Sequence, residues 1–292
     1  MTQITLLDGG MGQELVHRAG DRPTPLWSTQ IMIDHPGLVE EVHRDFCTAG
    51  ATIATTNSYA IHRDRLEGTG LEAMFADLHM KAVQEAKQAG AARIAGSIGP
   101  LVASYRADVM PPHDEAVRKY DEVVSLLAPH VDFIICETVV SVAHAKASLE
   151  AALQCDKPVW IAFSVSDRDG TLLRSGEPLA DALAVCDGAN AVLVNCSAPE
   201  AIPAALDVLA TSSKPYGAYA NGFEMITEDF LADKPTVDAL SKRRDFTPAI
   251  YADHAMAWVA QGATIIGGCC EVSPTHISQI ASRLRAAGHE IV

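Results

Sequence analysis

The sequence has few basic and aromatic residues and no long apolar run. Its 292 residues include 22 Lys and Arg against 37 Asp and Glu, a formal net charge of −15, and only 5% are aromatic. An acidic chain without a basic cluster is a poor partner for nucleic acid. No segment approaches the roughly 20 apolar residues of a membrane span, and the start, MTQITLLDGG, lacks the basic and apolar parts of a signal peptide. We therefore expect a soluble, cytoplasmic protein that binds neither nucleic acid nor membrane.

The cysteines do not have the pattern of a disulfide framework. There are seven, an odd number without regular spacing, which is unlike a secreted domain stabilised by disulfides. Apolar residues make up 48% of the chain and charged residues 20%, which is enough for a full core and excludes a disordered or fibrous protein. These features favour a globular enzyme of a reducing compartment.

Short apolar runs alternate with amphipathic segments along the whole chain. Runs such as FIIC, VWIAF and AVLV are typical of strands buried on both faces of a parallel sheet. The predicted strands are 4–10, 51–59, 92–100, 132–139, 158–166, 189–197, 215–222 and 263–272. The predicted helices are 35–49, 71–89, 112–128, 141–154, 179–186, 199–210, 248–261 and 274–287. Eight strand–helix pairs in one domain of residues 1–292 predict an α/β fold, the (β/α)8 TIM barrel.

Two of the segments that follow predicted strands are long. In a barrel, these segments carry the reactive groups. We expect loops at 11–34 after the first strand and at 223–247 after the seventh. The second has mixed charge and is too long for a simple connection, so we expect a lid or specificity segment there; a plain surface insertion is the alternative.

The sharpest local signal is GGCCEVSPTHI (267–277). It places Cys269 and Cys270 at the end of the eighth strand, and Cys196 in VNCSAP lies at the end of the sixth. Three thiolates at one rim have the number and softness to hold Zn²⁺ with its fourth position open, as in a catalytic site. The alternative is that these cysteines are small core residues, which fits the other four cysteines well.

A set of motifs resembles one family. The segments are LLDGGMGQEL (6–15), PLWS (25–28), TTNSYA (55–60), AGSIGP (95–100), CETV (136–139), VNCS (194–197) and IGGCCEVSPTHI (266–277). Together they resemble the homocysteine S-methyltransferase family, which includes enzymes that use S-methylmethionine, the betaine-dependent enzyme and the homocysteine module of methionine synthase. The resemblance implies a (β/α)8 barrel with zinc on Cys196, Cys269 and Cys270, which would activate the thiol of homocysteine.

The resemblance also implies a site for the amino-acid part of homocysteine. Asp8 and Glu137 would hold the ammonium group, and the backbone at Gly9, Gly10 and Met11 would meet the carboxylate. Gly-Gly lets backbone N–H groups approach an anion closely. The alternatives are that Asp8 bonds its own turn and that Glu137 is a solvated charge at the rim.

The resemblance implies a cationic onium compound as the methyl donor, for which aromatic faces are suitable partners. We expect Trp27 of PLWS to line its site, followed by Tyr59 and then Tyr105. Trp27 and its neighbours look more like the enzymes that use S-methylmethionine, so we expect that donor first and S-adenosylmethionine second, with betaine or another onium compound as the alternative. Two departures from the family bear on the donor. Glu271 follows the cysteine pair, and the usual Tyr-Pro-Asn is YAN, which still supplies Asn221 as a substrate-binding residue.

Two rival functions compete with methyl transfer. A zinc-dependent barrel hydrolase would use His and carboxylate ligands, but the 11 histidines form no H-x-H or H-E-x-x-H pattern. A non-catalytic barrel that binds zinc or senses redox state is the second rival, and Glu271 beside the cysteines favours it. We expect methyl transfer from a sulfonium donor to homocysteine, in a protein whose sequence is compatible with an oligomer.

Overall fold

Parallel pairing runs through the whole sheet of the computed structural model, which describes residues 2–21, 24–227, 229–231 and 239–292. The strands are β1 (Gln3–Leu6), β2 (Ile53–Thr55), β3 (Arg93–Ile98), β4 (Phe133–Val139), β5 (Val159–Phe163), β6 (Ala191–Asn195), β7 (Tyr216–Tyr219), β8 (Ile265–Ile266) and β9 (Glu290–Ile291). Their order is β2-β3-β4-β5-β6-β7-β8-β1-β9. The ring closes where the N–H of Thr52, just before β2, donates to the C=O of Leu6 in β1 at 2.8 Å. The predicted (β/α)8 barrel is confirmed.

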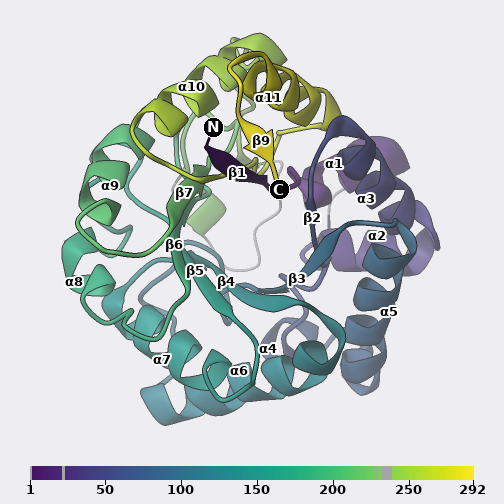
Figure 1. Ribbon diagram of the computed structural model, residues 1–292. Helices are drawn as coiled ribbons and strands as arrows, with labels where there is room; N and C mark the ends of the chain where they lie inside the picture. Colours follow the sequence, from purple (N-terminus) through teal and green to yellow (C-terminus); the bar gives the residue numbers. More distant parts are fainter. Residues whose placement is uncertain (1, 22–23, 228, 232–238) are drawn as a thin grey trace.

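Helices surround this ring on its outer side (Figure 1). The α-helices are α1 (Met11–Ala19), α2 (Ser28–Asp34), α3 (Leu38–Ala49), α4 (Arg63–Leu66), α5 (Phe75–Gln88), α6 (His113–Leu127), α7 (Val142–Ala152), α8 (Leu179–Leu183), α9 (Ile202–Leu209), α10 (Pro248–Ala260) and α11 (Pro274–Ala286). Three short 3-10 helices are η1 (Glu72–Met74), η2 (Ala128–His130) and η3 (Asp229–Leu231). Each of the eight predicted helices contains an observed one.

The predicted loop at 11–34 is wrong, because this segment contains helices α1 and α2. In α1, Met11 and Leu15 lie one turn apart and both are buried, so the segment has an apolar face to pack. Gly20 ends the helix with a φ of 70°, in the left-handed region that favours glycine. The polar residues between these positions hid the helical pattern.

The observed strands are shorter than predicted, and one was missed. Every predicted strand overlaps an observed strand, but the eighth keeps only Ile265–Ile266 of the predicted 263–272. The residues that follow turn out of the ladder to build the rim of the barrel. Strand β9 was not predicted because it has two residues; it pairs with β1 and places the C-terminus beside the N-terminus.

A packed apolar cluster fills the inside of the barrel. Phe133 of β4 is fully buried there, with its ring 4.2 Å from that of Trp160 in β5. The Arg93 guanidinium lies 4.9 Å from the Phe133 ring and covers it. Strands β7 and β8 approach so closely that a Cβ on Gly217 would lie 1.8 Å from the carbonyl oxygen of Ile265, so only glycine fits. The larger cluster lies between the sheet and the helices.

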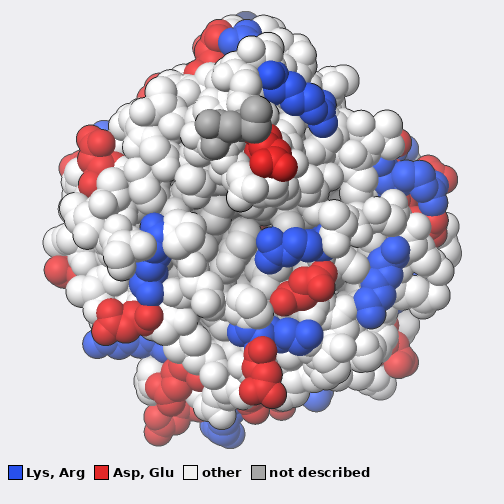
Figure 2. Space-filling model, in the orientation of Figure 1, with Lys and Arg blue, Asp and Glu red and all other residues white. Residues whose placement is uncertain are grey.

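The surface bears charges of both signs. Figure 2 shows the face that carries the two chain termini, where acidic and basic side chains are interspersed. None of the helices in the described part of the chain is long and apolar enough to span a bilayer.

The predicted lid at 223–247 falls partly on 228 and 232–238, which lie outside the described residues. Of the rest, Phe223 bridges to Lys242, and Phe230 packs 5.9 Å from the ring of Tyr105.

We expect Phe133→Ala to lower the free energy of unfolding by about 3–5 kcal/mol, because it leaves a cavity in the barrel interior. The matched control is Ile250→Ala on α10, where the side chain is 40% exposed; this change should cost less than about 1 kcal/mol. Denaturant unfolding of the two variants measures the difference. Equal losses would contradict a packed interior.

Candidate active site

A cavity of about 550 Å³ opens at the carboxyl ends of the strands. Binding sites of small molecules have volumes of this order, about 300–1,000 Å³. Its wall contains most of the residues singled out in the sequence: Asp8, Gly9, Gly10, Met11, Trp27, Tyr59, Tyr105, Glu137, Cys196, Cys269 and Cys270. Asn221 is not among the wall residues. It is buried, and its Oδ1 accepts a hydrogen bond from the N–H of Phe223 at 3.2 Å, so it holds its own turn.

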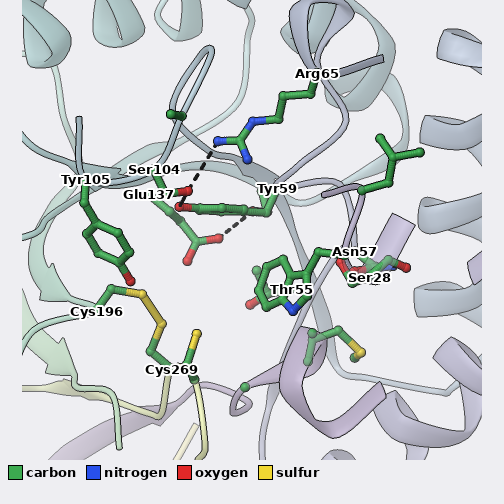
Figure 3. A pocket seen from close by; sticks show the side chains of 18 of the residues that line it. Ser28, Thr55, Asn57, Tyr59, Arg65, Ser104, Tyr105, Glu137, Cys196 and Cys269 are labelled. Atoms are coloured by element: carbon green, nitrogen blue, oxygen red, sulfur yellow. Dashed lines mark hydrogen bonds between the residues drawn. A yellow bond between two sulfur atoms is a disulfide. The ribbon is translucent and has the colours of Figure 1, made fainter. Parts of the chain in front are cut away.

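Three cysteine sulfurs converge at the inner end of the cavity. Cys196 follows β6, Cys269 and Cys270 follow β8, and the three Sγ atoms lie within 4.8 Å of one another. Cys196 and Cys269 are joined as a disulfide, whereas Cys270 is free (Figure 3). The structure thus differs from the predicted set of three thiolates in one respect. The Cys196–Cys269 disulfide has to be reduced by two electrons before these two cysteines can be thiolates.

The backbone at 219–222, which is the last residue of β7 and the three that follow it, sets the positions of all three cysteines. The N–H of Cys196 donates to the C=O of Tyr219 at 3.3 Å, and the N–H of Cys269 donates to the C=O of Ala220 at 3.0 Å. The C=O of Cys270 accepts from the N–H of Gly222 at 2.8 Å. Because one segment pairs with both cysteine-bearing loops, the sulfurs of β6 and β8 are held together across β7.

The Arg174 side chain holds the loop that carries Cys196. The Arg174 Nη2 donates to the C=O of Cys196 at 3.0 Å, and the Ser164 hydroxyl donates to the same oxygen at 3.1 Å. Arg174 is itself paired with Asp167, at 2.8 Å. Cys196 has a φ of 47°, a left-handed conformation that is costly for a residue with a side chain. These bonds maintain the strained backbone that points its sulfur into the cavity.

The donor set fits a soft metal ion. Three thiolates from a reduced site match the ligands that zinc and similar ions prefer, and they leave room for one further ligand. Without a metal, burial and the charge of Glu271 raise the pKa of the Cys270 thiol to about 12, so this thiol is protonated at neutral pH. A cation is therefore what this buried cluster needs in order to be deprotonated.

Asp8 is buried at the end of β1, where it contacts β2. Its Oδ2 accepts from the N–H of Thr55 at 2.7 Å, and its Oδ1 accepts from the Thr55 hydroxyl at 2.8 Å. These hydrogen bonds tie Asp8 to the neighbouring strand as well as to the end of β1. Burial raises its pKa to about 7, the Thr55 bonds oppose this shift, and the nearby Glu137 charge adds to it.

Glu137 is the second buried carboxyl of the cavity and is not a solvated rim charge. It accepts from the Ser97 hydroxyl at 2.5 Å and from the Tyr219 hydroxyl at 2.9 Å, while burial raises its pKa. Among the described residues, no Lys or Arg nitrogen lies within 4.0 Å of Glu137 or Asp8. His43 Nδ1 is 3.9 Å from Asp8, but burial lowers the pKa of His43 to about 3, so it is neutral. Two buried carboxyls without a cation partner fit a cationic ligand group.

The glycines after β1 let the chain pack closely against the cysteine loop. A Cβ on Gly10 would lie 2.5 Å from the carbonyl oxygen of Cys269. The N–H of Gly10 donates to the C=O of Val272, and the N–H of Met11 donates to the C=O of Gly9, each at 2.9 Å. Two of the three N–H groups thus bond the chain itself, and a role of the backbone at Gly9, Gly10 and Met11 toward a substrate carboxylate stays a prediction.

Aromatic rings also line the cavity. Trp27 and Tyr59 meet edge to face with centroids 6.2 Å apart. Tyr105 is buried, and the Arg174 guanidinium covers its ring at 4.8 Å. The Arg65 guanidinium lies 5.9 Å from the centre of the Tyr59 ring, whereas among the described residues no Lys or Arg lies over the ring of Trp27. Trp27 therefore presents an uncovered, electron-rich face of the kind that stabilises an onium ion.

Glu271 supports the aromatic wall from behind. Trp27 Nε1 donates to Gln13 Oε1 at 3.0 Å, and Gln13 Nε2 donates to Glu271 Oε1 at 2.7 Å. Lys242 Nζ lies 2.7 Å from Glu271 Oε2. Glu271 itself does not line the cavity. The residue that departs from the family pattern thus links the cysteine loop to the indole through a buried amide.

Sequence reasoning missed several polar residues of the site. The hydroxyls of Thr55, Ser97 and Tyr219 hold the two carboxyls. Thr55 and Ser97 stand in the motifs TTNSYA and AGSIGP and Tyr219 in YAN, so a hydroxyl at a strand end was an available signal. Gln13 and Arg174 had no such signal, because their roles depend on contacts far apart in the sequence.

The chain is similar to known proteins over most of its length. A family model described as homocysteine S-methyltransferase matches residues 5–284. The homocysteine S-methyltransferase of Escherichia coli (strain K12) is 32% identical, covering 96% of this chain and 95% of the relative. Two solved structures of the homocysteine methyltransferase MmuM from Escherichia coli, a metallated and an oxidized form, each cover 96% of both chains with a TM-score of 0.76, at 27% and 29% identity.

Asp8→Asn should change how stability depends on pH. The pKa of Asp8 is about 7 in the folded chain against a reference of 3.8. Between these two pH values the folded state binds a proton that the unfolded state has lost. The free energy of unfolding of the wild-type chain therefore falls as the pH rises. Relative to wild type, the variant should gain about 2–3 kcal/mol of unfolding free energy between about pH 5 and about pH 8. Denaturant unfolding without ligands measures it, and a difference independent of pH would contradict this pKa.

Proposed function

This chain belongs to the homocysteine S-methyltransferase family, and we propose that it takes the methyl group from a sulfonium donor, S-methylmethionine first and S-adenosylmethionine second, with zinc as its metal. The activity itself is methyl transfer to homocysteine, which gives methionine. The observation that carries the proposal is the convergence of three sulfurs and two buried carboxyls without cation partners on one cavity.

The cysteines are assigned to the acceptor's sulfur. A free thiol of this kind has a pKa of about 8.5, so only a small fraction is thiolate at neutral pH. Zinc bound by Cys196, Cys269 and Cys270 would supply the positive charge that keeps the acceptor sulfur deprotonated and nucleophilic. The disulfide has to be reduced first, because its sulfurs carry no thiolate charge.

The two buried carboxyls are assigned to the acceptor's ammonium group. Asp8 and Glu137 lie close enough for the charge of one to raise the pKa of the other. An ammonium between them would remove this repulsion and favour the ionised form of both. The hydroxyls of Ser97 and Tyr219 fix the carboxylate of Glu137, so the acceptor is oriented as well as bound.

The reaction is a single displacement at the methyl carbon. The acceptor sulfur forms a bond to this carbon while the bond to the donor sulfur breaks, and the cationic sulfonium leaves as a neutral thioether. Charge is neutralised in this step, so a cavity that excludes water helps it. Trp27 and Tyr59 suit the donor cation, since aromatic faces attract it without the reactivity of an anion.

Removal of one sulfur should abolish both metal binding and turnover. After reduction, the wild-type chain should hold about one zinc ion, and Cys270→Ser should lose most of it together with methionine formation, since two thiolates bind zinc more weakly than three. Cys155→Ser is the matched control, because Cys155 follows α7 and lies outside the cavity wall. Zinc by mass spectrometry and methionine by chromatography are the two measurements. Full activity of a zinc-free Cys270→Ser variant would refute the assignment.

A donor panel tests the sulfonium assignment. With homocysteine as acceptor, S-methylmethionine should give the highest kcat/KM, S-adenosylmethionine a lower value, and betaine little product, because PLWS resembles the enzymes that use S-methylmethionine. Methionine is measured for each donor at equal concentration. Turnover with betaine but with neither sulfonium compound would overturn the donor and leave the zinc assignment in place.

A further inference from the structure

In the part of the chain that the structure describes, one cationic side chain of the cavity wall has no ionic partner. Arg65 comes from α4, and its side chain lines the cavity. Among the described residues, no carboxylate oxygen lies within 4.0 Å of its guanidinium nitrogens. Arg106, the other arginine of the wall, is paired with Asp108 at 2.6 Å. A guanidinium of this kind, partly buried and not neutralised, favours an anionic ligand.

The guanidinium is held in place by neutral groups. Nη2 donates to the C=O of Pro100 at 2.9 Å and to the Ser104 hydroxyl at 3.3 Å. The Ser104 hydroxyl also bonds the Tyr59 hydroxyl, at 2.9 Å. Arg65 Nε is buried without a hydrogen-bond partner in the part of the chain described here. The Arg65 guanidinium is thus oriented, and some of its N–H groups remain available to a ligand.

Arg65 and the cysteines approach the cavity from different sides. Its guanidinium carbon lies 5.9 Å from the centre of the Tyr59 ring. Figure 3 shows the Tyr59 ring between Arg65 and the Cys196–Cys269 pair. A ligand that reaches from the sulfurs past this ring would end at Arg65. The acceptor's ammonium, by contrast, is placed at Asp8 and Glu137.

We propose that Arg65 binds the carboxylate of the methyl donor, so that the cavity selects sulfonium compounds carrying an amino-acid carboxylate. This inference rests on the proposed function, in which a sulfonium is the donor. Asp64 lines the same wall, and its Oδ1 has no hydrogen-bond partner among the described residues. Its Oδ2 accepts from the N–H of Val102 at 3.0 Å and lies 4.0 Å from Lys119 Nζ, so Oδ1 is the atom available for the ammonium group of the same donor.

The charge of Arg65 also works against donors that lack a carboxylate. A bare sulfonium ion in the cavity meets a guanidinium that has no carboxylate oxygen within 4.0 Å among the described residues, and like charges repel. A donor with its own carboxylate removes that repulsion and gains a charge-assisted bond. The same residue therefore favours one donor class and disfavours the other.

The test compares two donors in three variants with saturating homocysteine. The donors are S-methylmethionine and trimethylsulfonium, which has no carboxylate; the variants are Arg65→Gln, Arg65→Lys and the control Arg63→Gln. Arg63 lies on the same helix, is exposed and is paired with Glu122. Arg65→Gln should lower kcat/KM for S-methylmethionine about tenfold or more and leave that for trimethylsulfonium unchanged or raised. Arg65→Lys should restore part of the preference, and Arg63→Gln should behave as wild type.

Three readouts separate the possible failures. The KM for homocysteine should stay the same in all folded variants, since Asp8 and Glu137 bind that substrate. An equal loss with both donors, or a preference that survives in Arg65→Gln, would overturn the role of Arg65. Titration of S-methylmethionine into protein saturated with methionine measures donor binding without turnover. Binding that depends on Arg65 in a chain that transfers no methyl group from it would overturn the proposed donor and support the carboxylate site.

Discussion

The backbone that follows β7 is the constraint on which the site depends. Its carbonyl groups at Tyr219 and Ala220 accept the N–H groups of Cys196 and Cys269, so loops from β6 and β8 are tied to one template. Strand β7 lies between those two strands in the sheet, so its end can bond the loop on either side. A change in the path of this segment would separate the cysteines.

The charges of the cavity form a pattern that a ligand completes. Within the described residues, Asp8 and Glu137 are buried at one part of the wall without a Lys or Arg partner, and Arg65 lies at another without a carboxylate partner. Burial of unpaired charge costs free energy of folding, so each group is a cost in the free chain that substrate binding relieves. The aromatic rings lie between these groups and provide the neutral surface that a cation about to lose its charge requires.

The sequence predicted the barrel because strands buried on both faces have a strong apolar signal, and it predicted the cysteine cluster because strand ends share one rim. It did not predict α1 and α2, whose helical pattern is short and broken by polar residues. It also did not predict the hydrogen bonds that the N–H groups of Gly10 and Met11 make to the chain itself. Nor did it find Gln13, whose amide joins Trp27 to Glu271. Glu271 lies 258 positions from Gln13 in the sequence. Contacts of this kind depend on the packed structure and leave no local pattern.

We propose that three cysteine sulfurs bind one metal ion and leave a position for the thiol of the acceptor. X-ray absorption at the zinc edge measures it directly on the reduced, zinc-loaded chain. We expect three sulfur ligands at about 2.3 Å with one lighter ligand, changing to four sulfurs when homocysteine is added. A zinc coordination shell that gains no sulfur from homocysteine would contradict the account.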